Sequence, residues 1–174
     1  MTDELITMDD RRQLGLWAAD CVERALPLFE AKVPHDTRPR EALECVRSFG
    51  NGGERTKQIR TAAWAANSAA RETSDPVAVL VARAALYVAG TAYIHSLESP
   101  HQVNHVFGPA VAAAQARELN AGGDTQAGDD EIRWAIEHAP PAVRGIVQRL
   151  PAGKFTGSRR GVLSRQLDEG LRGG

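Results

Sequence analysis

Residues 14–50 hold the feature that most constrains the fold: two segments with apolar stripes, joined by a short polar elbow. From Leu14 to Ala25 the apolar residues recur at steps of three and four, which is the spacing of one face of an α-helix. The elbow at residues 34–37 carries turn-forming side chains, and the apolar stripe of 42–49 predicts a second helix after it. We therefore expect two antiparallel helices in this region.

Capping residues and prolines mark where helices begin and where they break. Thr7, with Asp10 three residues later, resembles a capping pair at the start of the first helix. Pro27 stands too deep for a first helical turn, so a kink or a helix end is expected just before it. Asp75 followed by Pro76 has the pattern of a cap and a first helical residue, which predicts another helix start.

The same pattern of residues predicts a helix that begins after Ser99, where Gln102 completes a capping box. Gly108 and Pro109 interrupt this helix and are expected to bend it. No useful length of β-type alternation occurs in the chain. The sequence thus predicts an all-α, single-domain bundle of about six to eight helices, some of them kinked at proline.

Length and composition predict one domain followed by a tail. A chain of 174 residues can bury a core of its own. We assign residues 1–151 to the helical domain. Residues 152–174 are rich in glycine and arginine, so we expect them to be loosely docked or disordered.

The charge balance gives no general reason to bind nucleic acid or an anionic membrane, because 21 Lys and Arg stand against 22 Asp and Glu. The mostly apolar segment 77–94 contains Arg83 near its centre, which is costly in lipid, so a central buried helix is expected instead of a membrane span. The first residues lack the features of a secretory signal, which predicts a cytoplasmic protein with reduced cysteines.

No catalytic, phosphate-binding or metal-ligand motif of high specificity occurs, so no catalytic, cofactor or metal residue is assigned. His101 and His105 lie four apart on one helix face, a spacing at which two side chains can share a metal. One hypothesis is therefore a small-ligand or metal-binding protein, or an enzyme, with its site at these histidines and the Gly108-Pro109 bend. The alternative is that they belong to a polar helix face.

Arg38 and Arg40 flank Pro39 directly after Asp36, which concentrates two planar, fork-shaped hydrogen-bond donors at the elbow. These side chains could bind a carboxylate on a partner. An internal pair between Asp36 and either arginine would instead fix the turn, and we favour that interpretation.

Three segments resemble the all-helical immunity proteins encoded beside bacterial polymorphic toxins: LWAADCVERALPLFE at 16–30, DTRPREALE at 36–44 and EIRWAIEHAPPAVRGIVQRLP at 131–151. The residues that carry most of the likeness are Trp17, Ala18, Ala19, Asp20, Cys21, Pro27, Asp36, Arg38, Pro39 and Arg40. The resemblance implies a bacterial protein that binds a cognate toxin domain and neutralises it by covering its active site, without catalysis or a cofactor.

The side chains that such an interface would use are aromatic or charged anchors. The candidates are Asp36, Arg38, Arg40, His101, His105 and Trp134. Trp17 and Trp64 are expected in the core instead. A self-associating module, with a dimer face supplied by the apolar segment 77–94, is a further hypothesis.

Overall fold

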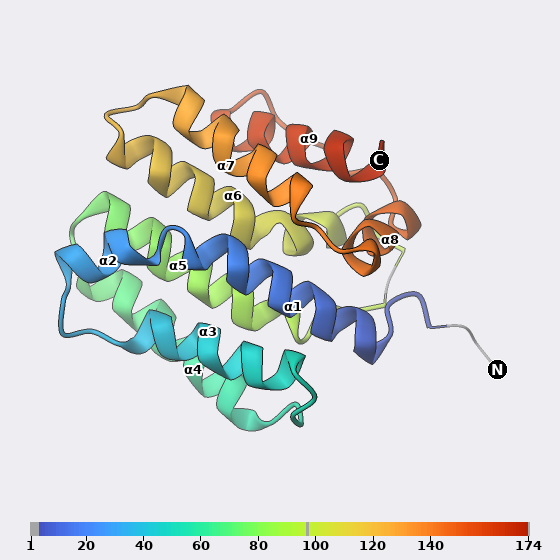
Figure 1. The fold of residues 1–174 in the computed structure, drawn as a ribbon, viewed down its shortest axis with the longest axis horizontal. Helices are drawn as coiled ribbons and strands as arrows, with labels where there is room; N and C mark the ends of the chain where they lie inside the picture. Colours follow the sequence, from blue (N-terminus) through green and yellow to red (C-terminus); the bar gives the residue numbers. More distant parts are fainter. Residues whose placement is uncertain (1–3, 97, 174) are drawn as a thin grey trace.

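The computed structural model describes residues 4–96 and 98–173, and in this part of the chain nine helices and no strand are present (Figure 1). The helices are α1 (Met8–Glu23), α2 (Leu26–Lys32), α3 (Arg38–Gly50), α4 (Lys57–Glu72), α5 (Pro76–Thr91), α6 (Gln102–Asn120), α7 (Thr125–Glu137), α8 (Pro141–Arg149) and α9 (Arg159–Arg172). The all-α prediction is confirmed, and the number of helices is one more than the upper bound expected.

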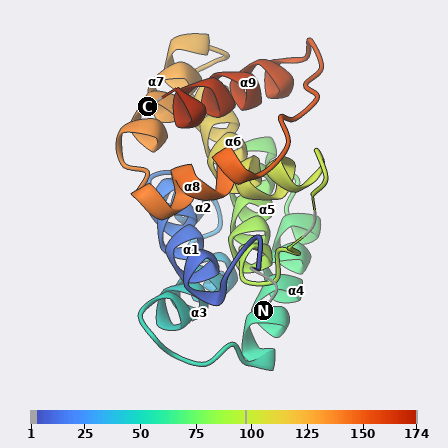
Figure 2. The same cartoon turned by 90° about the vertical axis from the view of Figure 1, so that its right-hand side faces the viewer.

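Helix α5 lies at the centre of the bundle, in contact with α1, α2, α3, α4 and α6 (Figures 1 and 2). Its small apolar side chains are buried against these neighbours, whereas Arg83 is exposed, as the sequence predicts. No helix in the described part of the chain combines the length and the apolar character needed to cross a membrane. Because the apolar side chains of α5 lie inside the bundle, they cannot supply the dimer face considered above.

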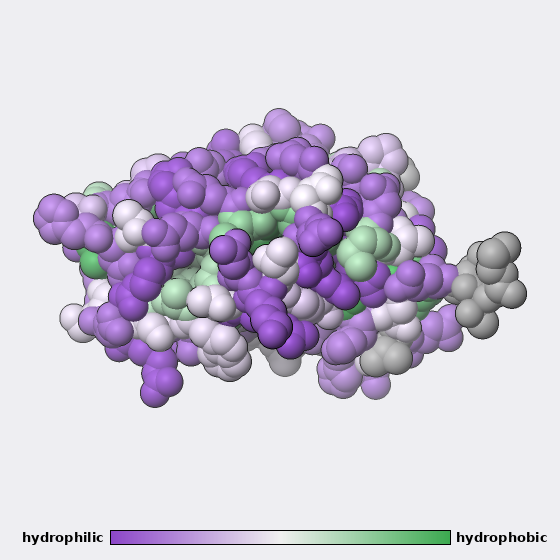
Figure 3. All heavy atoms as spheres, turned by 90° about the horizontal axis from the view of Figure 1, so that it is seen from below, coloured by the Kyte–Doolittle hydropathy of each residue, from purple (hydrophilic) through white to green (hydrophobic). Residues whose placement is uncertain are grey.

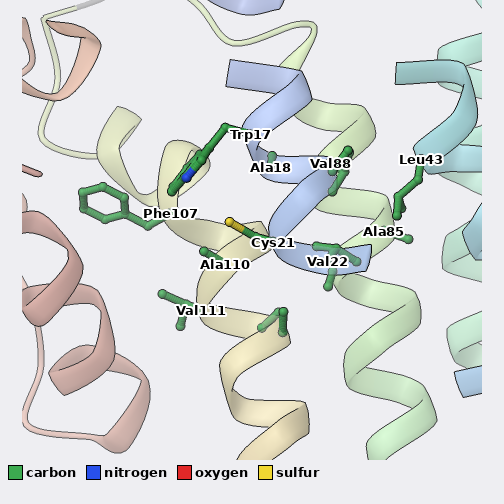
Figure 4. Packing of buried hydrophobic residues seen from close by; sticks show 14 of the residues in the cluster. Trp17, Ala18, Cys21, Val22, Leu43, Ala85, Val88, Phe107, Ala110 and Val111 are labelled. Carbon is green, nitrogen blue, oxygen red and sulfur yellow. The ribbon is translucent and has the colours of Figure 1, made fainter. Parts of the chain in front are cut away.

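Small residues let the helix axes approach closely around α1 (Figure 4). Ala18 and Val22 on α1 are fully buried among core side chains that include Val88 of α5 and Phe107 of α6. Gly15 is needed on this helix, because a Cβ there would lie 2.8 Å from Cγ1 of Val46 on α3. Alanine and glycine contacts of this kind bring the helices close together, and large side chains such as Leu14, Phe49 and Phe107 fill the rest of the core.

Two of the predicted helix starts are confirmed in atomic detail. The Thr7 hydroxyl accepts a hydrogen bond from the Asp10 amide (3.0 Å), and the Asp10 carboxylate accepts one from the Thr7 amide (2.9 Å). Asp75 accepts from the amide of Ala78 at 2.9 Å. Helix α1 ends at Glu23 and α2 begins as a separate helix at Leu26, with Pro27 in its first turn, so the break expected just before Pro27 is also confirmed.

Helix α6 differs from expectation at two places. It begins at Gln102, with His101 as the N-cap, because Ser99 uses its hydroxyl to accept from the His101 amide (3.3 Å) and Gln102 turns inward and is buried. It then continues through Pro109 as one helix instead of being interrupted. Along this continuous stretch of helix, Pro109 and the residues on either side of it are buried in the core.

The segment after Pro151 differs most from the sequence-based prediction of a loosely docked or disordered tail. Leu163, Leu167 and Leu171 of α9 are fully buried, and α9 contacts α6, α7 and α8 (Figure 2). Arg159 at the start of α9 donates hydrogen bonds to Glu118 of α6 and Asp129 of α7. A leucine stripe at helical spacing inside the glycine-rich composition explains the docking, so the helical domain extends beyond residue 151.

Helix α9 can be tested by truncating one of its buried leucines. Leu167→Ala removes a fully buried side chain, so we expect the free energy of unfolding to fall by roughly 2–5 kcal/mol. The matched change Glu169→Ala lies on the exposed side of the same helix and should alter it by less than about 0.5 kcal/mol. Urea denaturation measures both variants, and an unaltered midpoint for Leu167→Ala would show that α9 is not docked.

Candidate functional site

At the elbow, Arg38 is bound within the chain. Its Nε and Nη2 atoms donate to the two carboxylate oxygens of Asp36 at 2.9 and 2.7 Å, and Nη2 also donates to Glu72 of α4 at 2.6 Å. The hydrogen bonds from the Arg38 side chain lower the pKa of Asp36, and those to Asp36 and Glu72 raise the pKa of Arg38. The arginine thus joins the start of α3 to the end of α4.

Arg40 is also paired, although with acids other than Asp36. Its Nε and Nη2 atoms each donate to a carboxylate oxygen of Glu30 at 2.7 Å, and Nη1 reaches Glu23 at 3.4 Å. The hydrogen bonds from Arg40 lower the pKa of Glu30. The elbow side chains therefore show the internal pairing that the sequence favoured, and contact with a partner stays a prediction.

His101 and His105 are both exposed near the start of α6. His105 and Gly108 line a cavity of about 390 Å³ between α5 and α6, together with Tyr87 of α5 and Arg160 of α9. Among residues 4–96 and 98–173, no three His, Cys, Asp or Glu side chains gather as metal ligands would. The cavity has room for a small molecule, so the small-ligand hypothesis stays a prediction for this place.

Trp134 on α7 is half-buried, and its ring is in contact with two other side chains. The ring of His138 stacks on it at 4.0 Å between centroids, and the guanidinium of Arg24 lies 4.4 Å from its centroid. Arg24 in turn donates to the buried carboxylate of Glu131 at 2.8 Å. These contacts give Trp134 a role in joining α1 to α7 and leave less of its ring for a partner.

Trp64 was expected in the core, and this expectation is wrong. Trp17 is only 2% exposed and donates from Nε1 to the Ala135 carbonyl at 2.9 Å, as expected of a core residue, whereas Trp64 is 70% exposed. On α4 the buried residues include Ile59 and Ala66, and Trp64 stands about 140° round the helix from Ile59. This helical geometry is the signal in the sequence that places Trp64 outside.

An open groove of about 630 Å³ runs between α3 and α4. Glu41 and Glu44 line it from α3 and Glu54 from the loop that connects the two helices, whereas Ala62 and Ala65 line it from α4. Figure 3 looks onto this side of the molecule and shows apolar atoms framed by hydrophilic side chains. The groove is thus acidic at its edges and partly apolar inside.

Cys45 lines the groove too, and burial, with the nearby charges of Glu41 and Glu44, raises the pKa of its thiol. A raised pKa keeps a thiol protonated and unreactive. Both Cys21 and Cys45 are free thiols.

The exposed Trp64 lies close to the groove in the sequence of α4. Thr61 lines the groove and stands about one turn before Trp64 on the same helix, so the exposed indole lies beside the groove.

The structure does not bring the six predicted interface residues together. Asp36, Arg38 and Arg40 lie at one end of the bundle, and the start of α6, with both histidines, lies toward the other (Figure 1). Trp134 stands on α7, on the far side of the bundle from α3 and α4 (Figure 1). The exposed indole and the groove beside it, which sequence reasoning missed, form the better candidate for a binding surface. We call it the α3–α4 face and define it by Glu41, Glu44, Glu54, Thr61, Ala65 and Trp64.

The charge of Asp36 can be tested without disturbing the turn, because the Asn side chain retains an oxygen that can accept from the Arg38 amide. In Asp36→Asn we expect a loss of about 1 kcal/mol of unfolding free energy at neutral pH. The pKa of Asp36 is lowered in the folded protein, so its contribution is present above the ordinary carboxylate range and disappears as the pH falls through that lowered value.

Thermal or urea unfolding of both proteins across acid pH measures this difference. We expect the gap between wild type and Asp36→Asn to close below about pH 4. A gap that stayed constant throughout the acid range would assign the effect to packing and not to the ion pair.

Comparison with protein families finds one whose model matches residues 4–142, described as Imm-5 like putative immunity protein. The match covers α1 to α7 and the start of α8, and thus includes the whole α3–α4 face. Curated proteins and solved structures give no significant match. Because the family model matches most of the chain, this protein belongs to the Imm-5 like putative immunity protein family.

Proposed function

We propose that this protein confers immunity by binding a cognate toxin protein in a stable complex and covering its active site, without catalysis. Membership of an immunity protein family is the observation that carries the proposal. Inhibition by occlusion needs a rigid surface that presents a few strong anchors. The bundle, with its closely packed core behind α4, supplies such a support.

The α3–α4 face is the surface that we assign to the toxin. Tryptophan is among the residues most enriched at the energetic centres of protein interfaces, and Trp64 presents a largely exposed ring. In the described part of the chain, the other exposed large apolar residues are less exposed than Trp64, which is 70% exposed: Met8 is 38% and Leu119 is 43% exposed.

The first experiment identifies the partner. The protein serves as bait in a lysate of the cells it comes from, and the retained protein is then produced in susceptible cells, alone and together with this chain. We expect the retained protein to stop growth when alone and to be harmless in the presence of this chain. A retained protein without toxicity, or protection without binding, would refute neutralisation by occlusion.

The anchor is tested by Trp64→Ala. Because the side chain is mostly exposed, we expect little change in the free energy of unfolding, but a loss of about 2 kcal/mol or more in binding to the toxin. Titration calorimetry with the purified toxin measures the affinity.

Leu119→Ala is the matched control, since it removes a large exposed apolar side chain from α6, away from the α3–α4 face. It should bind as tightly as the wild type. Equal affinities for Trp64→Ala and Leu119→Ala would place the interface elsewhere on the molecule.

A further inference from the structure

We propose that the α3–α4 groove receives a basic segment of the toxin, whose lysine or arginine side chains pair with Glu41, Glu44 and Glu54 while its apolar side chains contact Trp64. The inference rests on the proposed function, because it names the chemistry of the toxin surface that this immunity protein covers. It commits the occupant to a cationic, amphipathic stretch of the partner protein.

The first support is local charge. Three glutamates line the groove and no lysine or arginine does, although the whole chain has a formal charge of only −1. Of the arginines near the groove in sequence, Arg55 and Arg60 both lie over the ring of Tyr93, at 5.1 and 4.6 Å from its centroid, and Arg47 pairs with Asp20 at 2.6 Å. The negative charge of the groove is therefore not neutralised by these side chains.

The second support is the contrast with carboxylates elsewhere. Asp36, Glu30 and Glu131 are each held by an arginine, and these ion pairs brace the fold. In residues 4–96 and 98–173, neither Glu44 nor Glu54 has a cation within ion-pair distance. These two carboxylates are exposed and have no bracing role in the fold, so they are available to a partner.

The third support is the shape of the groove. Ala62 and Ala65 lie where α4 faces the groove, and their short side chains leave a hollow instead of filling it. The aliphatic stem of an arginine or lysine fits such an apolar floor while its charged end reaches the acidic edge. Complementary charge of this kind speeds association and selects the partner, and salt weakens it.

The test replaces the three groove carboxylates by their neutral isosteres in one variant, Glu41→Gln/Glu44→Gln/Glu54→Gln. We expect binding to the purified toxin to weaken by about tenfold or more, mainly through slower association, and to depend less steeply on salt. The matched control Glu98→Gln/Glu137→Gln/Glu169→Gln removes the same charge from exposed positions outside the groove and should retain wild-type rates. Equal behaviour of the two variants in stopped-flow binding would overturn the inference.

A second variant tests the groove without changing its charge. Ala65→Leu keeps a good helix former in α4 but fills the hollow, so we expect weaker binding with an unchanged circular dichroism spectrum. Wild-type affinity in Ala65→Leu would show that the segment does not enter the groove.

A probe that does not depend on the toxin separates this inference from the proposed function. The probe is a short helical peptide of leucine and arginine, with a leucine and glutamate peptide as its negative control, titrated into the labelled full-length protein and followed by NMR. We expect the NMR signals of residues on the α3–α4 face to shift with the arginine peptide only. Signal changes spread over the whole surface, or no changes, would overturn the groove assignment.

The cell assay separates the two proposals. Full protection of cells by the variant without the groove charges would overturn the groove assignment and leave the proposed immunity function intact.

Discussion

Burial of α5 among five other helices is the constraint on which the rest of the structure depends. Its buried alanines and valines present small side chains to its neighbours, so α1, α3, α4 and α6 can pack against it at short distances. Gly15 extends the same close packing to the contact between α1 and α3. With the inner faces of these helices held in this way, the outer side of α4 presents Trp64 on a firm support.

Much of this fold was predictable because local rules govern it. The caps at Thr7 and Asp75 and the break before Pro27 follow from contacts within a few residues, and the structure confirms them. At Ser99 the prediction was wrong, because burial of Gln102 prevailed over a capping box. Tertiary packing, which a single sequence does not display, overrides a local preference there.

The candidate site was less predictable, for two physical reasons. On α4 the buried face is formed by Ile59 and alanines, so the large apolar side chain of Trp64 suggested a core position although its angular position on the helix points away from that face. Arginine partners were hidden by distance along the chain: Arg24 with Glu131 and Arg159 with Glu118 join residues that no local pattern connects. The leucine stripe of α9 was present in the sequence, but glycine-rich composition concealed it.

The two-sided character of α4 has a consequence for how such proteins diversify. Its buried side, which includes Ala66 and Ala70, faces the bundle, where α4 contacts α3 and α5, and its outer side carries the exposed Trp64. Substitutions at Trp64, Thr61 or the groove glutamates therefore leave the core undisturbed. With the α3–α4 face as the toxin-binding surface that we propose, a lineage could exchange these residues one at a time and acquire a new partner while the bundle beneath stays the same.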